Sequence, residues 1–267
     1  MGRFFALVLV GWLGCAPLAS AADERDPLAR ARVLYNQRNY EEAIAAADQA
    51  RSTPARADSA DLIAARAYLE RYRESSAPDD LTNARERLRR LDPHRFATVE
   101  RLEFMIGLAE ALYFDGSFGA AADLFDSVLV QADTVMGQDE RERVIDWWAS
   151  ALDRDARQRP EIERQVVYQR IRDRMQAELG STITSSPAVY WLSVAARGQG
   201  DLQGAWEAVQ AGWVRAGLAS DRGAALKADL EKLVLIALVP ERARALGQPP
   251  EMLRQEWEQF KERWARP

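Results

Sequence analysis

The segment that decides the fold is GLAEALYFDGSFGAAADLFDSVL, from Gly107 to Leu129. Apolar residues recur in it at intervals of three and four, which is the spacing of one face of an α-helix. The polar stretch 115–117 interrupts this pattern, and Ser117 can cap the helix that follows. The segment therefore predicts two helices joined by a short turn.

Three other segments share this layout of a helix, a short polar turn, a large apolar residue and then an alanine that opens a second helix. They are LYNQRNYEEAIAAADQA (34–50), DDLTNARERLRRLDP (79–93) and VYWLSVAARGQGDLQGAWEAVQAGW (189–213). The second fits only in its second helix, because its turn, Ser75 to Asp80, is longer than usual. The aligned alanines are Ala43, Ala84, Ala121 and Ala205. The last gap between them is about twice the others, so we expect a divergent unit there, with helices over 139–157 and 160–179.

These segments resemble tetratricopeptide repeats, whose unit is ~34 residues in two antiparallel helices. The residues that match the family's packing positions are Ala31, Leu34, Tyr40, Ala43, Ala47 and Ala50 in the first segment, Met105, Leu108, Ala109, Leu112, Gly116, Phe118, Ala121, Phe125 and Val128 in the third, and Leu192, Ala196, Gly200, Leu202, Ala205 and Val209 in the fourth. A single hairpin cannot bury its own apolar face, but a stack of hairpins shares one core. The resemblance implies an all-α, right-handed α-solenoid of about five hairpins with a concave groove.

The C-terminal part has a different pattern. A helix is expected over 221–239, a short one from Pro240 to Gly247, and a last one over 251–265. In the last helix Leu253, Trp257, Phe260 and Trp264 recur at spacings of four, three and four, which predicts one aromatic stripe. The stripe either caps the solenoid or docks into a partner.

The first residues have the layout of a secretory signal peptide. Arg3 is a short positive region, Phe4 to Leu13 is an apolar run of about ten residues, and Ala19 to Ala21 is a small-x-small cleavage site. The run is short for a membrane span, which needs about 20 residues. The expected organisation is therefore a leader (1–21), a repeat domain (22–217) and C-terminal helices (218–267).

The only cysteine, Cys15, lies inside this leader. Leu13-Gly14-Cys15-Ala16 is similar to a bacterial lipoprotein signal, so a lipid anchor at Cys15 is the alternative to cleavage after Ala21. With cleavage after Ala21, the mature chain has no thiol and forms no disulfide. No later stretch is long and apolar enough to predict a transmembrane span.

Composition and motifs give little support for catalysis. The net charge of -5 disfavours general binding to nucleic acid, which needs a basic surface. The single histidine, His94, cannot build a multi-histidine metal site. The glycines of 198–204 follow a helix and not a strand, so they predict a repeat turn and not a dinucleotide loop. Glu74-Ser75 is similar to the acid motif of lytic transglycosylases, exported enzymes with α-solenoids, and keeps a glycan-cleaving enzyme as an alternative.

The expected function is that of a non-enzymatic scaffold in the bacterial periplasm or cell envelope, with no cofactor and no metal. The resemblance implies that a peptide or protein partner lies in the concave groove and contacts outward residues of each first helix. By register these are Arg32, Tyr35 and Asn36 in the first segment, Glu103, Glu110, Tyr113 and Phe114 in the third, and Tyr190 and Arg197 in the fourth. A lipoprotein subunit of an outer-membrane assembly is a further alternative.

Overall fold

The computed structural model describes residues 26–131, 135–218 and 223–264, which form helices and turns and contain no strand. The predicted all-α class is therefore confirmed for these residues. The expected leader, 1–21 with Cys15, lies outside them. The chain divides into two compact units, one ending at Arg87 and the other beginning at Leu88. The C-terminal helices belong to the second unit.

Unit 1 consists of four helices with an alanine-rich core. They are α2 (Pro27–Asn36), α3 (Tyr40–Ala50), α4 (Ala57–Ser75) and α5 (Pro78–Leu88). The Asp26 carboxylate accepts a 3.0 Å hydrogen bond from the amide of Leu28, so α2 begins at the predicted capping residue followed by proline. Helix α2 packs against both α3 and α4. Small side chains at this crossing, such as Ala31, Ala47 and Ala64, are fully buried and let the helices approach closely.

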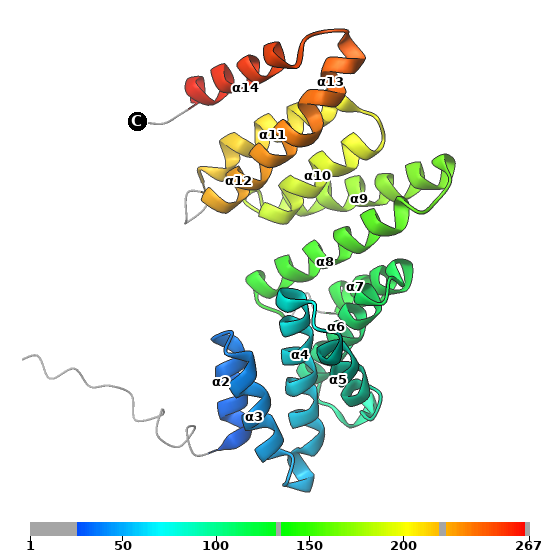
Figure 1. Cartoon of the computed structure of the whole chain (residues 1–267), viewed down its shortest axis with the longest axis vertical. Coiled ribbons are helices and arrows are strands. Elements are labelled where there is room, and N and C mark those ends of the chain that lie inside the picture. The colour runs from blue at the N-terminus through cyan, green and yellow to red at the C-terminus, as the bar shows by residue number, and fades with distance from the viewer. Residues whose placement is uncertain (1–25, 132–134, 219–222, 265–267) are drawn as a thin grey trace, which may run out of the picture. The chain divides into compact units, whose positions relative to one another are not determined.

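Unit 2 contains nine α-helices among the described residues. They are α6 (Thr98–Phe114), α7 (Phe118–Gln131), α8 (Gln138–Ala156), α9 (Glu161–Ser181), α10 (Ser186–Gly198), α11 (Leu202–Ala216), α12 (Ala224–Leu233), α13 (Val239–Leu246) and α14 (Pro250–Trp264). Both helices of the expected divergent unit, α8 and α9, are present within two residues of the predicted ranges. From α6 to α12 each helix packs against the next one along the chain (Figure 1).

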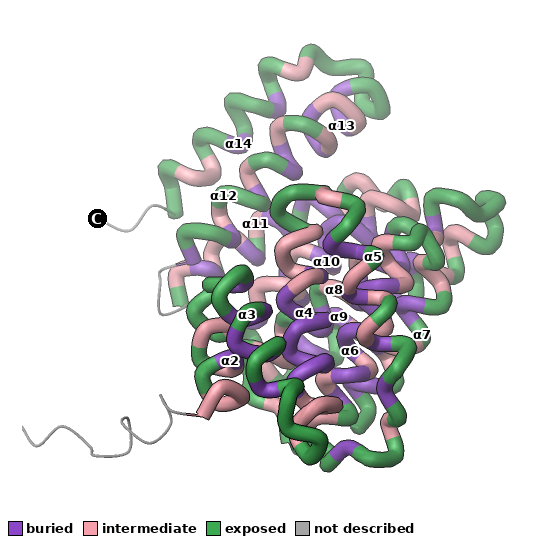
Figure 2. The backbone as a smooth tube through the Cα atoms, turned by 60° about the horizontal axis from the view of Figure 1, so that its bottom comes forward, coloured by how far each residue is buried: buried purple, intermediate pink, exposed green. Residues whose placement is uncertain are grey.

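The helices of unit 2 also alternate between two rows. Helix α6 contacts α8, α8 contacts α10, and α10 contacts α12, so these four form what we call the first row. Helices α7, α9 and α11 form the second row, which ion pairs join from α7 to α9 and from α9 to α11. Buried positions lie where neighbouring helices meet (Figure 2). Packing of neighbours in sequence order, with alternate helices in contact, is the arrangement of an α-solenoid.

Three turns, between α2 and α3, α6 and α7, and α10 and α11, have the same backbone hydrogen bond. In each, the residue before the second helix donates its amide N–H to the carbonyl five residues earlier. The pairs are Asn39–Leu34 at 2.9 Å, Ser117–Leu112 at 2.9 Å and Asp201–Ala196 at 3.0 Å. The residue before each donor has a positive φ, namely Arg38 at 64°, Gly116 at 80° and Gly200 at 80°. The aligned alanines, Ala43, Ala121 and Ala205, are all fully buried. The three segments thus fold into the same helix–turn–helix unit.

The sequence predictions differ from the structure in two details. The short helix expected from Pro240 to Gly247 is present as α13, with Pro240 in its first turn and Gly247 after its end, but α12 leads into it through a π-helical segment, Val234–Leu238, without a break. Proline lacks an N–H and its ring clashes with the carbonyl four residues earlier, so the helix widens: the amide of Val239 donates to the carbonyl of Val234, five residues back. The turn expected over 75–80 is also shorter, since α4 ends at Ser75 and α5 begins at Pro78.

Candidate protein-binding face

On one face of the first row of unit 2, polar contacts connect α6 to α8 and α8 to α10. The Tyr113 hydroxyl of α6 lies 2.9 Å from the Ser150 hydroxyl of α8. The Trp191 indole N–H of α10 donates a 2.7 Å hydrogen bond to Asp146 of α8. Asp146 and Ser150 are four residues apart and therefore share one side of α8. We call the surface around this side the first-row face.

A separate polar contact joins α10 to α13. The Arg197 guanidinium donates two hydrogen bonds to the Glu241 carboxylate, at 2.8 Å from Nε and 2.5 Å from Nη2. These hydrogen bonds raise the pKa of Arg197, although burial opposes them. This bidentate geometry fixes both side chains. The Arg197 guanidinium is therefore already paired with Glu241 inside the protein.

Two exposed arginines of α8, and a third directly after its end, carry positive charge on or next to this face. Arg143, Arg154 and Arg157 stand at helical spacings from Asp146 and Ser150. Arg154 also lies over the Phe118 ring, with its guanidinium carbon 6.0 Å from the ring centroid. Exposed arginines beside aromatic rings are typical of protein interfaces.

Tyr113 and Phe114, two predicted groove residues, are half-buried and pack against Trp147 of α8. Their ring centroids lie 4.9 and 5.6 Å from that of Trp147, both edge to face. The ring of Phe118 lies 5.2 Å from that of Tyr113. The sequence left open whether such aromatics bind a partner or pack between helices, and here they connect α6 with α8.

Tyr190 is also half-buried, with its ring centroid 5.3 Å from that of Trp191. Burial raises the pKa of Tyr190, and the charges of Asp229, Asp153 and Asp146 raise it further. Of the predicted residues, Tyr113, Phe114, Tyr190 and Arg197 all lie on first-row helices of unit 2.

The remaining predicted groove residues have other environments. Glu110 of α6 is 4% exposed, so it is a core position and not a surface contact, while Glu103 is half-buried. Arg32, Tyr35 and Asn36 belong to α2 in unit 1. There the ring of Tyr35 lies 5.9 Å from that of Tyr40 and 5.1 Å below the guanidinium carbon of Arg66, whereas Asn36 is exposed.

Sequence reasoning missed a buried polar cluster between α8 and α9. The Asp153 carboxylate, 5% exposed, accepts a 3.0 Å hydrogen bond from the Tyr168 hydroxyl and pairs with Arg157 at 2.7 Å. Burial, with the charge of Asp153, raises the pKa of Tyr168 to about 12. The Tyr168 ring lies so close to Gly198 of α10 that a Cβ there would be 2.4 Å from it. The sequence does contain one indication of this cluster, because Asp153 stands among apolar positions of α8 that face the core.

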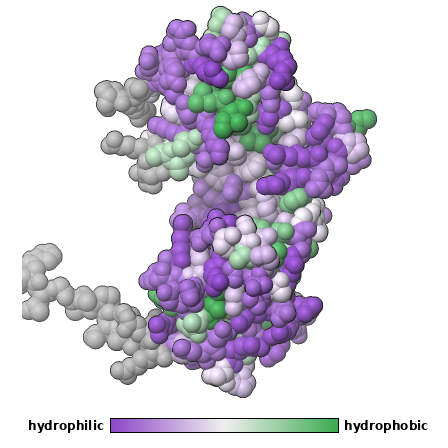
Figure 3. Space-filling view, viewed as in Figure 1, coloured by the Kyte–Doolittle hydropathy of each residue, from purple (hydrophilic) through white to green (hydrophobic). Residues whose placement is uncertain are grey.

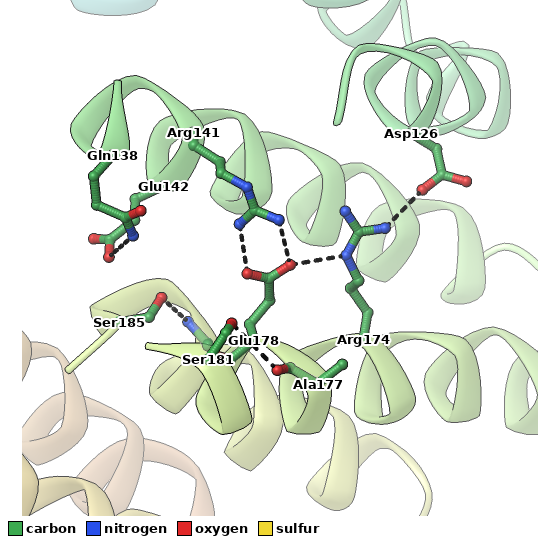
Figure 4. A network of polar contacts seen from close by, with 10 residues as sticks. Asp126, Gln138, Arg141, Glu142, Arg174, Ala177, Glu178, Ser181 and Ser185 are labelled. Atoms are coloured by element: carbon green, nitrogen blue, oxygen red, sulfur yellow. Dashed lines mark hydrogen bonds and ion pairs between the residues drawn. The ribbon is translucent and has the colours of Figure 1, made fainter. Parts of the chain in front are cut away.

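A second buried carboxylate joins the two rows (Figure 4). Glu178 of α9 accepts hydrogen bonds from Arg141 of α8, at 2.5 and 2.9 Å, and from Arg174 at 3.1 Å. Arg174 in turn reaches Asp126 of α7 at 3.3 Å. Burial alone would raise the pKa of Glu178, but the hydrogen bonds and charges of the two arginines lower it. All of these charges are engaged with one another, which indicates a structural network.

Other surface features bear on chemistry and location. Figure 3 shows a hydrophobic patch on the surface of unit 2. Ile236 of the π-helical segment is an apolar residue that is 68% exposed. His94 is exposed in a short 3₁₀ turn, and Glu74 is exposed in the last turn of α4. Within 26–131, 135–218 and 223–264 no cluster of three or more potential metal ligands occurs. In the same ranges, no helix combines the length and apolar character needed to span a bilayer.

No protein-family model matches the chain, and comparison with curated proteins and with solved structures finds no similar protein.

Proposed function

We propose that this protein is a non-enzymatic scaffold that binds a peptide or another protein on the first-row face of unit 2. The observation that carries the proposal is the pair of exposed arginines of α8, Arg143 and Arg154, on a face that polar contacts fix from α6 to α10, with Arg154 over the half-buried Phe118 ring. A face whose residues are already fixed loses little conformational entropy when a partner binds. Charged side chains beside that face supply specificity.

Further parts of the proposal come from the sequence. We infer that the helix–turn–helix units are of tetratricopeptide type, from the packing residues and the shared turns. The N-terminal leader supports export to the periplasm or cell envelope. The mature chain is then a soluble scaffold, unless Cys15 carries a lipid anchor.

The test is crosslinking and affinity capture from native envelope extracts. The informative variant is Arg143→Glu/Arg154→Glu, which reverses two charges of the face without touching its buried contacts. We expect it to lose the proteins that the wild-type chain captures. Tyr113→Ala/Phe114→Ala is a poor probe, because it removes rings that hold α6 to α8.

The matched control is Arg215→Glu/Arg263→Glu, which changes the net charge equally on exposed positions of α11 and α14. Both variants should keep the helical circular dichroism of the wild-type protein. A captured set that is the same for the wild type and the α8 variant would contradict this binding face. Equal loss with both variants would show a nonspecific charge effect and would contradict it as well.

A further inference from the structure

Two arginines of α8 have no carboxylate partner, although the arginines around them do. The neighbouring ion pairs are Arg141–Glu178 at 2.5 Å, Arg157–Asp153 at 2.7 Å and Arg159–Asp155 at 2.6 Å. Arg143 and Arg154 are exposed, and within the described residues neither of them makes an ion pair. Their two positive charges are therefore available to a partner.

The two unpaired arginines lie on one line along α8. They are 11 residues apart (154 − 143), or about three helical turns, so their side chains leave α8 in nearly the same direction, about 16 Å apart along the axis. Trp147 and Ser150 stand between them on the same side of the helix. Both are half-buried and both contact Tyr113 of α6, with 4.9 Å between the ring centroids and 2.9 Å between the hydroxyl oxygens. The line thus has a positive charge at each end, with an aromatic ring and hydroxyl groups in the middle.

The carboxylates beside this line are already engaged within the protein. Asp146 accepts a 2.7 Å hydrogen bond from the indole N–H of Trp191, and Asp153 is buried at 5% exposure. Asp139, one turn before Arg143, is exposed and marks the end of the positive line. Between the two arginines, an incoming carboxylate therefore meets no exposed carboxylate that lacks a hydrogen-bond donor of its own.

This pattern fits an acidic segment of a protein in an extended conformation. An extended chain rises about 3.3 Å per residue, so two carboxylates about five residues apart span the distance of about 16 Å between the arginines. A guanidinium binds a carboxylate through two parallel hydrogen bonds, which orient the bound group. A long polyanion such as a nucleic acid needs a broad basic surface, and the net charge of -5 disfavours it.

We propose that the partner of the first-row face is an acidic, extended protein segment. Two of its carboxylates, about five residues apart, bind Arg143 and Arg154, and an apolar side chain between them packs on Trp147. This inference rests on the proposed function, since it names the chemistry of the partner that the scaffold binds.

The test is fluorescence anisotropy of the purified full-length protein with a labelled peptide that contains Glu-Ser-Leu-Ser-Ser-Glu. Replacing either glutamate of the peptide by glutamine should weaken binding about threefold, and replacing both about tenfold, as expected for exposed ion pairs. Arg143→Gln and Arg154→Gln should each weaken binding of the original peptide about threefold as well. The control Arg215→Gln changes an exposed arginine of α11 and should leave binding unchanged.

Combining the protein variants with the peptide variants shows which groups meet. If Arg143 binds one glutamate, the removal of that glutamate should cost no further affinity in Arg143→Gln, while removal of the other glutamate should still cost about threefold. Arg154→Gln should show the reverse pattern. All variants should keep the helical circular dichroism of the wild type.

Three outcomes would overturn the acidic segment. They are no binding of the peptide to the wild type up to about 1 mM, equal binding of the glutamine peptide, or equal loss in every combination of variants. If envelope proteins are still captured through Arg143 and Arg154, the scaffold stands and only the acidic segment is wrong. Coupled binding of the peptide without any captured protein would support the chemistry and contradict the scaffold.

Discussion

The Tyr168 hydroxyl donates a 3.0 Å hydrogen bond to the Asp153 carboxylate, and both side chains are buried between α9 and α8. Tyr168→Phe removes this bond but keeps the ring against Gly198. The loss should destabilise the fold by about 1–2 kcal/mol at pH 7, because a buried acceptor loses one of its donors. Urea unfolding of the two proteins, followed by circular dichroism, measures the difference.

The same pair predicts a pH dependence at alkaline pH. The pKa of Tyr168 is about 12 in the folded chain and 10.0 as its ordinary value, so the folded chain holds this proton more tightly than the unfolded chain. The contribution is fully present below pH 10 and is lost as the pH rises from 10 toward 12. The free-energy difference between the wild type and Tyr168→Phe should therefore shrink across this window, and a constant difference would contradict the assignment.

Glu178 predicts the opposite behaviour in acid. Its pKa is lowered below the ordinary 4.5 in the folded state, so its contribution is present above that value and is lost as the pH falls through the folded pKa. Glu178→Gln should cost about 1.5–3 kcal/mol at pH 7, because Arg141 and Arg174 lose their charged acceptor. Denaturation curves at pH 7 and pH 3 should show a smaller gap between variant and wild type at the lower pH.

Arg38 occupies a backbone position that glycine occupies in the equivalent turns. Its φ is 64°, and the matching residues are Gly116 and Gly200. A left-handed conformation disfavours a residue with a Cβ by about 1 kcal/mol, so Arg38→Gly should stabilise unit 1 by about that amount. The reverse change, Gly116→Ala, should destabilise unit 2 similarly. If thermal melts show no increase in stability for Arg38→Gly, the Arg38 side chain makes contacts that offset the backbone strain.

Gly198 and Gly180 are both helical glycines, but their surroundings differ. A Cβ at Gly198 would meet the Tyr168 ring at 2.4 Å, whereas nothing lies within 4 Å of one at Gly180. Gly198→Ala should therefore destabilise unit 2 by about 1–3 kcal/mol through overpacking. Gly180→Ala should stabilise α9 by about 0.5–1 kcal/mol, because alanine favours the helix. Chemical denaturation should therefore show a lower free energy of unfolding for Gly198→Ala and a higher one for Gly180→Ala.

The helices and their shared turns could be predicted because they rest on local signals. Spacing of apolar residues gave α8 and α14 within one residue at each end, and a capping aspartate before proline gave the start of α2. The π-helical segment could not be predicted, since proline at position 240 signals a helix end as readily as a bulge. The structure has the bulge and not a helix end, with Leu238 and Val239 fully buried in the core.

The candidate site was predicted less well, because side-chain partners come from distant parts of the chain. Register predicted Arg197 as an outward residue of its helix, but its pairing with Glu241 depends on how α13 follows the π-helical segment. Glu110 was expected at the surface and is buried, since α6 is covered on more than one side. Asp153 stands among the apolar positions of α8, which indicates burial, but its hydrogen bond depends on the position of Tyr168 on α9.

The π-helical segment Val234–Leu238 sets the rotational phase of everything after it. Each residue of an α-helix turns the chain by about 100°, and a π-type bulge accommodates one extra residue without extending the axis by a full step. That one residue rotates Glu241 toward Arg197 and Arg242 toward Trp206. A chain one residue shorter at this point would have nearly the same composition but would direct a different pair of side chains into those two contacts.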